Sequence, residues 1–90
     1  MSISVGDIVD VDLGRDPLTG VREIVRQECV ALFDSPDQPV ETRVRFRGIA
    51  GGNVPRPERI NAVNTLSDVE SMLRTGQMVY VRRATKASAA

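Results

Sequence analysis

The chain of 90 residues has no histidine and no tryptophan, a single cysteine and only three aromatic residues. Without histidine it cannot build a His-based catalytic triad, most zinc sites, or the commonest general base near neutral pH. The single cysteine excludes an internal disulfide and a thiolate metal cluster. Cys29 lies among apolar residues, so we expect a small core residue rather than a nucleophile. These absences predict a protein that is not an enzyme and that holds no metal or cofactor.

Long apolar runs are also absent, since none approaches the ~18 residues of a membrane span. Residues 1–5 lack the charged and apolar regions of a secretory signal. We therefore expect no membrane partner, and a place in the cytoplasm or in a particle assembled inside a cell. The length predicts one small domain, 1–83, followed by a polar tail, 84–90. Its aliphatic core can supply only about a few kcal/mol of net stability, which makes association with other chains an expected source of further burial.

Positive and negative residues are equal in number, twelve of each, but they are segregated along the chain. Residues 1–40 carry three Arg and eight acids, which gives −5, and residues 41–90 carry eight Arg, Lys86 and four acids, which gives +5. Such halves either neutralise each other within one fold or present complementary faces to neighbouring copies or other partners. Eleven of the twelve cations are Arg, whose planar guanidinium suits interfacial carboxylates and phosphates.

Alternating apolar and polar residues predict strands over 2–13, 41–47 and 77–83. The segment 41–47 alternates most regularly, with Val44 and Phe46 on one face and three arginines on the other. The first segment places its aliphatic residues on one face: Val5, Val9, Val11 and Leu13.

Segments rich in Gly and Pro, 14–20 and 35–39, predict turns between strands, and 48–58 is expected to be irregular. Residues 21–34 fit both a helix and a strand. Helical spacing and a strand face interrupted by Glu23 and Gln27 favour a helix, whereas the hairpin-like turn before the segment favours a strand. We favour the strand, and the helix stays open.

A short helix is predicted near the C-terminus. Ser67 and Glu70 have the spacing of a capping box, Val69 begins an apolar stripe, and Gly76 ends the helix. The order of elements predicts a mainly β or α+β fold: a small antiparallel sheet or an SH3-like, partly closed barrel with one short helix near the C-terminus.

The arginine ladder, formed by Arg43, Arg45 and Arg47, is the sharpest candidate site, and it suits three roles. It can pair across strands with the acids Asp10, Asp12 or Glu28, bind an acidic partner or the next copy, or bind nucleic-acid phosphates. The scarcity of aromatic residues disfavours single-stranded nucleic acid, whose bases need stacking platforms. The candidate partner-binding residues are Arg43, Arg45, Arg47, Arg56, Arg59, Arg82, Arg83, Asp10 and Asp12.

Two further patterns do not fit ligand sites. Asp7, Asp10 and Asp12 lack the glycine and the distal glutamate of a calcium loop. The glycine-rich residues 48–52 lack the Lys-Ser/Thr that completes a phosphate-binding loop. We therefore predict neither a metal site nor a nucleotide site.

Residues 6–13 (GDIVDVDL), followed by Asp16-Pro17 and Gly20, resemble the opening of the MazF/PemK-type toxin ribonucleases. Those proteins begin with a similar strand, a Gly-containing loop and a second apolar strand. The resemblance stops at residue 35, and Arg26-Gln27 stands where the family usually has Arg-Pro. It implies RNA cleavage, with Arg26 in the place of the catalytic arginine.

Residues 16–20 (DPLTG) and 30–36 (VALFDSP) resemble the first hairpin turn, and the strand end after it, of small phage virion proteins of the head–tail joining type. Residues 68–73, Gly76 and residues 79–81 resemble their late helix-turn and strand. The final strands of that family, after residue 81, have no counterpart here.

These patterns predict a non-enzymatic structural or assembly module that docks through acidic and basic faces, in its specific form a minor phage virion component of the head–tail region or tail. The expected partners are other protein subunits in a homo- or hetero-oligomer, with nucleic acid a less favoured partner. The alternative is a nucleic-acid-binding protein or a MazF-like toxin ribonuclease.

Overall fold

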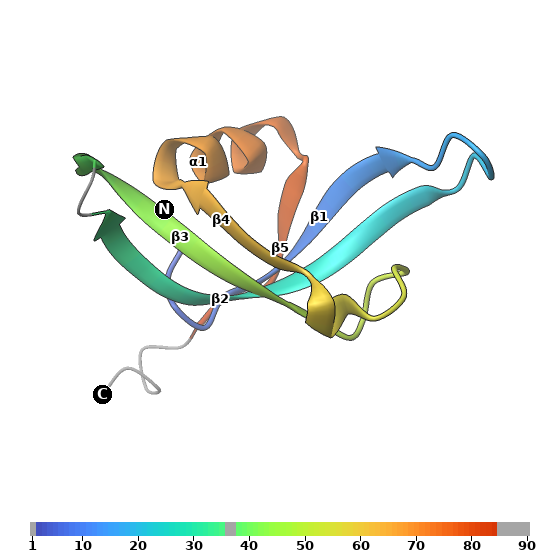
Figure 1. Cartoon of the computed structure of the whole chain (residues 1–90), viewed down its shortest axis with the longest axis horizontal. Helices are drawn as coiled ribbons and strands as arrows, with labels where there is room; N and C mark the ends of the chain where they lie inside the picture. The colour runs from blue at the N-terminus through green and yellow to red at the C-terminus, as the bar shows by residue number, and fades with distance from the viewer. Residues whose placement is uncertain (1, 36–37, 85–90) are drawn as a thin grey trace.

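The computed structural model describes residues 2–35 and 38–84, which form an antiparallel sheet with one α-helix (Figure 1). Its spatial strand order is β4-β3-β2-β1-β5, so β4 and β5 are the edges of an open sheet. The predicted mainly β fold with a short helix near the C-terminus is confirmed, in the form of a small antiparallel sheet. The elements are β1 (Ile8–Arg15), β2 (Arg22–Ser35), β3 (Gln38–Ile49), the 3-10 helix η1 (Pro57–Arg59), β4 (Asn61–Thr65), α1 (Leu66–Thr75) and β5 (Met78–Arg82).

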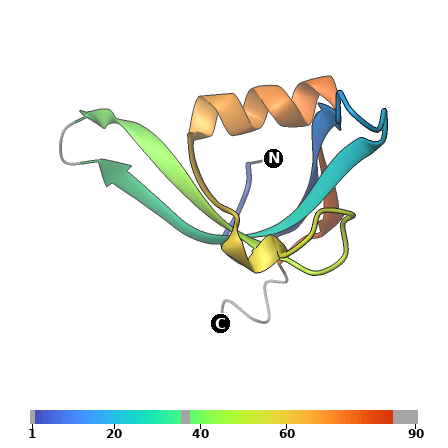
Figure 2. The same ribbon diagram turned by 45° about the vertical axis from the view of Figure 1, so that its right-hand side comes forward.

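The two long strands β2 and β3, of 14 and 12 residues, give the sheet its shape. The sheet bends into a trough, and α1 spans the open side of that trough like a beam (Figure 2). The β1–β2 hairpin extends to one side of the helix and the β2–β3 hairpin to the other (Figure 1). We call the face turned toward α1 the inner face and the convex face the outer face.

The inner face carries the core because the strands alternate as the sequence predicts. Val44 and Phe46 are fully buried, whereas the neighbouring Arg45 and Arg47 are exposed on the outer face. Val69 of α1 closes the core from above. The buried hydrophobic residues are Ile3, Val9, Val11, Val25, Cys29, Val44, Phe46, Val69 and Met78.

The segment that fits two patterns is the strand β2, so the strand interpretation is confirmed and the helix is excluded. A bulge between Cys29 and Ala31 explains the ambiguity. It inserts one extra residue, after which Leu32 lies opposite Val44 on the inner face. The apolar residues of the inner face, Val25, Cys29 and Leu32, thus recur after four and then three positions, which is also the spacing of a helix face.

The predicted strand over 2–13 is wrong at its start, since β1 begins at Ile8. Gly6 has a φ of 96°, which turns the chain, and Val5 is 53% exposed instead of lying on an apolar strand face. The turn folds the N-terminal residues back so that Ile3 enters the core. At the other end, Leu13 is the extra residue of a second bulge and is 54% exposed.

The helix α1 starts earlier than predicted. Its N-cap is Thr65, whose Oγ1 accepts a hydrogen bond from the backbone N of Asp68 at 3.1 Å, so Ser67 is not the cap. The hydroxyl of Ser67 instead donates to Glu41 at 3.1 Å. The predicted end is confirmed, because Gly76 adopts the left-handed conformation that ends many helices. Within residues 2–35 and 38–84, no helix is long and apolar enough to cross a membrane.

The predicted irregular segment 48–58 is irregular only over 50–56, because its first two residues belong to β3 and its last two to η1. It packs closely on its neighbours. A Cβ on Gly48 would lie 1.9 Å from the carbonyl oxygen of Pro57, and one on Gly52 would lie 2.2 Å from that of Ile24. The strand β4 that follows was not predicted. Of the segments predicted as a turn and a tail, residues 36–37 and 85–90 lie outside the described part of the chain.

Candidate interaction surfaces

The arginine ladder lies on the outer face, between β2 and β4. Arg45 is exposed, with its guanidinium carbon 5.5 Å from the centre of the Phe33 ring, a cation–π contact. Arg45 lies opposite Ala31 in β2 and opposite Val63 in β4, and Val63 is 49% exposed. Phe33, Arg45 and Val63 make a surface patch of an aromatic ring, a cation and an aliphatic side chain. Arg43, one step toward the hairpin end, is half-buried and also takes part in polar or ring contacts.

Arg47 pairs with an acid of the opposite half of the sequence. Its Nη2 lies 2.6 Å from Oε1 of Glu28, the residue directly across in β2. The interpretation of the ladder as a cross-strand pair with Asp10, Asp12 or Glu28 is therefore confirmed for one of its three arginines. Side-chain exposure of 59% for Arg47 limits this pair to about 0.2–1 kcal/mol.

Asp10 is bound by Arg26 in a two-pronged ion pair. Nε of Arg26 donates to one carboxylate oxygen at 2.8 Å and Nη2 donates to the other at 3.1 Å. The hydrogen bonds from Arg26 to Asp10 raise the pKa of the guanidinium above its ordinary value. Both residues come from the acidic half, so this pair neutralises charge within that half. Asp10 is thereby occupied inside the molecule.

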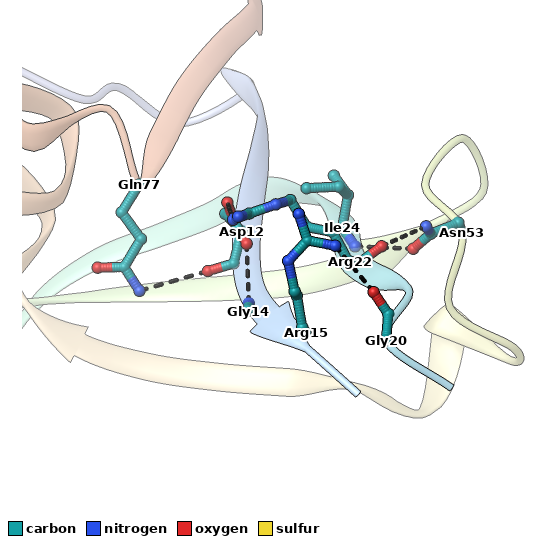
Figure 3. A network of polar contacts seen from close by, with 8 residues as sticks. All are labelled: Asp12, Gly14, Arg15, Gly20, Arg22, Ile24, Asn53 and Gln77. Carbon is teal, nitrogen blue, oxygen red and sulfur yellow. Dashed lines mark hydrogen bonds and ion pairs between the residues drawn. The ribbon is translucent and has the colours of Figure 1, made fainter. Parts of the chain in front are cut away.

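Asp12 is also occupied, at the base of the β1–β2 hairpin (Figure 3). Its Oδ1 accepts from the backbone N of Gly14 at 2.8 Å, and its Oδ2 pairs with Arg22. The hydrogen bond from Gly14, and after it the contact with Arg22, lower the pKa of the Asp12 carboxyl despite some desolvation. Asp12 therefore stabilises the hairpin, and its carboxylate is already paired within the molecule.

Asn53 extends the sheet where β3 has ended (Figure 3). Its side-chain Oδ1 accepts from the N of Ile24 at 2.7 Å, and its Nδ2 donates to the carbonyl of Arg22 at 2.7 Å. The amide group thus replaces a peptide group of a neighbouring strand, and it ties the glycine-rich connector to β2.

Asp7 is the most deeply buried charged residue, and it joins three parts of the chain. Its carboxylate accepts from the N of Ser4 at 2.8 Å, from the N of Ala84 at 2.6 Å and from Nε of Arg83 at 3.1 Å. Arg83 also lies 4.0 Å from the centre of the Tyr80 ring. We call this arrangement the Asp7 clasp. It assigns Arg83 a structural role that the sequence did not reveal.

The remaining predicted partner-binding residues are exposed: Arg56 and Arg59 around η1, and Arg82 at the end of β5. Arg82 lies opposite Ile8, which itself lies opposite Glu28, so it belongs to the same row of the outer face as Arg47. These three arginines are thus distinct from the arginines whose ion pairs stabilise the fold.

An uncharged groove under α1 is a site that the sequence analysis missed. It has a volume of about 240 Å³, and its lining includes Val11, Val25, Gln27, Ala62, Asn64 and Met72. Gln27 is only 4% exposed, and within residues 2–35 and 38–84 its side chain makes no hydrogen bond. The one available signal was the polar Gln27 in the apolar face of β2. We call this site the α1 groove.

Arg26 and the hydroxyl of Thr42, which RNA cleavage could use to stabilise the transition state and as a base, lie apart in the fold. Arg26 is paired with Asp10, whereas Thr42 donates to Asp34 near the far end of the β2–β3 hairpin. Cys29 is fully buried, and burial raises the pKa of its thiol to about 11, so it carries almost no thiolate near neutral pH. In the described part of the chain, no three side chains of the metal-binding types lie close enough to share an ion.

Comparisons with known proteins find no match, neither among protein-family models nor among curated proteins or solved structures. The two resemblances stated from the sequence therefore stay expectations.

Proposed function

We propose that this protein is a non-enzymatic assembly module that docks onto other protein subunits through the outer face of its sheet. The observation that carries the proposal is the patch of Phe33, Arg45 and Val63, with its exposed cation between an aromatic and an aliphatic side chain. Aromatic residues and arginine are enriched at protein interfaces, where the guanidinium binds carboxylates and the apolar groups are desolvated.

The charges around the patch support an acidic partner surface. On the outer face, Asp10 and Glu28 already have arginine partners, while Arg45 and Arg82 remain exposed. This leaves the face positive after internal pairing. Following the resemblance to head–tail joining proteins, we place the module in a virion, where subunits of this size dock onto neighbouring subunits.

Nucleic-acid binding is the second candidate, because the same arginines suit phosphates. Two features make it the weaker one. The aliphatic Val63 offers nothing to a phosphate or a base edge, and Arg26, the counterpart of a toxin's catalytic arginine, is held by Asp10. A MazF-like ribonuclease would need that arginine free to stabilise a transition state.

Light scattering at low and high salt tests the proposal. We expect the purified protein to associate at low salt and to lose part of that association as salt rises, because exposed charges are screened over ~8 Å at 0.15 M and ~3 Å at 1 M. Replacing all three ladder arginines with Gln should remove the salt-dependent part and change the melting temperature little. The double variant Arg56→Gln/Arg59→Gln is the matched control, with charges removed near η1 instead of the patch.

Docking onto further copies of the same chain would be contradicted if the association does not depend on salt, or if the protein stays monomeric at every salt concentration. Recovery of no protein partner from the native source would then contradict the proposal altogether. Site-specific cleavage of a long mixed-sequence RNA that disappears in Arg26→Ala would favour the ribonuclease instead.

A further inference from the structure

The α1 groove has the chemistry of a receptor for a neutral, aliphatic group. All of its lining side chains are uncharged, in a chain in which 27% of residues are charged. Apolar side chains dominate, and Gln27, Asn64 and Gln77 add three amides. Such a lining disfavours ions and phosphates, because a charge taken from water would meet no opposite charge. It favours an apolar group flanked by hydrogen-bonding atoms, as in a peptide.

Gln27 supports this interpretation independently. The residue is only 4% exposed and lines the groove, and its side chain makes no hydrogen bond within residues 2–35 and 38–84. Its amide atoms are not fully enclosed, since Tyr80 Oη is the one fully buried side-chain polar atom without a partner in those residues. Side-chain amides that line a site are among the polar groups that orient an occupant through hydrogen bonds. An occupant with peptide N–H and C=O groups would provide the partners that this amide lacks.

The size of the groove excludes a large ligand. Its volume of about 240 Å³ lies below the range of ~300–1,000 Å³ that is usual for cofactor and drug-sized ligands. It exceeds the ~150 Å³ of an engineered apolar cavity that binds benzene. One aliphatic side chain with its adjoining backbone fits between these limits.

The same chain presents such a group at the tip of the β1–β2 hairpin, residues 16–20. Leu18 is 93% exposed. The turn that carries it is fixed by hydrogen bonds from the N of Leu18 to Oδ1 of Asp16 at 2.8 Å, from the N of Gly20 to the carbonyl of Asp16 at 2.8 Å, and from Arg15 to the carbonyl of Gly20 at 2.9 Å. A rigid turn loses little conformational entropy on binding, which favours its use as an anchor.

We propose that the α1 groove binds the hairpin tip of a second copy of this chain, with Leu18 as the anchor. The inference rests on the proposed function, because the binding of tip to groove would join copies of an assembly module. Tip and groove are different surfaces, so the contact is heterologous and builds rings or open chains rather than closed pairs. Leu13, half-exposed at the groove rim, lies where it can pack against the incoming tip.

The test separates this contact from the charged outer face. At ~1 M salt, surface charges are screened beyond ~3 Å, whereas apolar contacts persist. We expect wild-type protein to keep associating there, and Leu18→Ser to weaken that association on the order of 30-fold in Kd, which is typical of an interface anchor. Val5→Ser is the matched control, because Val5 is also an exposed aliphatic residue and lies outside the tip and the groove.

A complementation experiment identifies the groove as the receptor. Asn64→Phe fills the groove and leaves the tip intact, whereas Leu18→Ser leaves the groove intact. Sedimentation should show each variant alone as a monomer at ~1 M salt and their mixture as a heterodimer and nothing larger. Should Asn64→Phe not fold, a cyclised peptide of residues 12–22 added to the Leu18→Ser protein should shift the methyl signals of Met72 and Met78 in NMR spectra.

Three results would overturn the inference. Wild-type protein that associates only at low salt would leave the outer-face proposal standing and remove this one. Association of Leu18→Ser equal to that of wild type at ~1 M salt would do the same. A mixture that stays monomeric, with no methyl shift on adding the peptide, would show that the α1 groove is not the receptor.

Discussion

The two faces of the sheet are made by the same strands, yet they are held by different interactions. On the inner face, residues such as Val44 and Phe46 are fully buried beneath α1. On the outer face, ion pairs such as Asp10–Arg26 and Glu28–Arg47 remain 27–59% exposed. Burial of apolar area stabilises a fold far more than exposed ion pairs do. The comparison suggests that the inner face specifies the structure and leaves the outer face available for binding.

The strongest test of this contrast replaces neighbouring residues of β3. We expect Phe46→Ala to lower the free energy of unfolding by about 3–5 kcal/mol, because it removes the largest fully buried side chain and leaves a cavity. Arg45→Ala, one position along and on the opposite face, should cost less than about 1 kcal/mol. Urea denaturation followed by circular dichroism measures both. Equal losses would mean that the outer face contributes to the fold as much as the core.

The second test compares the buried carboxylate of the Asp7 clasp with a carboxylate on the outer face. Asp7 is buried and accepts three hydrogen bonds, so Asp7→Asn places an amide NH₂ against a donor and should cost about 2–4 kcal/mol. Asp10→Asn disturbs only a partly exposed ion pair and should cost about 1 kcal/mol or less. Chemical denaturation of the two variants under the same conditions gives the difference. A larger effect at Asp10 would reverse the assignment of which carboxylate matters to stability.

The third test uses pH to probe the inner face. Burial raises the pKa of the Cys29 thiol from 9.0 to about 11, so the unfolded chain releases this proton at a lower pH than the folded one. The stabilisation is therefore complete below pH 9 and is lost between pH 9 and about 11, by up to about 2–3 kcal/mol.

The control for the pH test is Cys29→Ala, in which this part of the pH dependence should disappear. Burial also raises the pKa of Tyr80, and the dependence that remains in the variant includes that contribution. Denaturation midpoints at pH 8 and pH 11 measure the change. An unchanged slope in the variant would show that the thiol does not contribute.

The periodicity of apolar residues predicted the inner-face positions of β3, but it predicted neither the bulge in β2 nor the edge strand β4. The alternation in β3 predicted both faces correctly, because that strand pairs in register along most of its length. In β2 the bulge after Cys29 produces a helix-like spacing, which no counting of apolar residues can distinguish from a helix. The edge strand β4 was missed because its pattern is reversed, with Val63 outside and Asn64 on the groove side.

The candidate sites were less predictable, since the pairing of charges depends on register. Sequence alone placed Asp10 and Asp12 as partners for the arginine ladder or for another subunit. In the fold they lie beside Arg26 and Arg22, because β1 and β2 form a hairpin whose register brings these side chains together. The α1 groove is lined by residues of β1, β2, β4 and α1, so it forms only in the folded chain and no local pattern in β2 predicts it.

The Asp7 clasp has a kinetic consequence. Its bonds to Arg83 and Ala84 close loops of 76 and 77 residues, nearly the whole length of the chain, whereas the two hairpins form between neighbouring segments. Closing long loops costs more chain entropy, so such contacts tend to form after local ones. The clasp is then absent from the transition state for folding. Breaking it should leave the folding rate almost unchanged and accelerate unfolding, so that Asp7 governs how long the folded molecule persists.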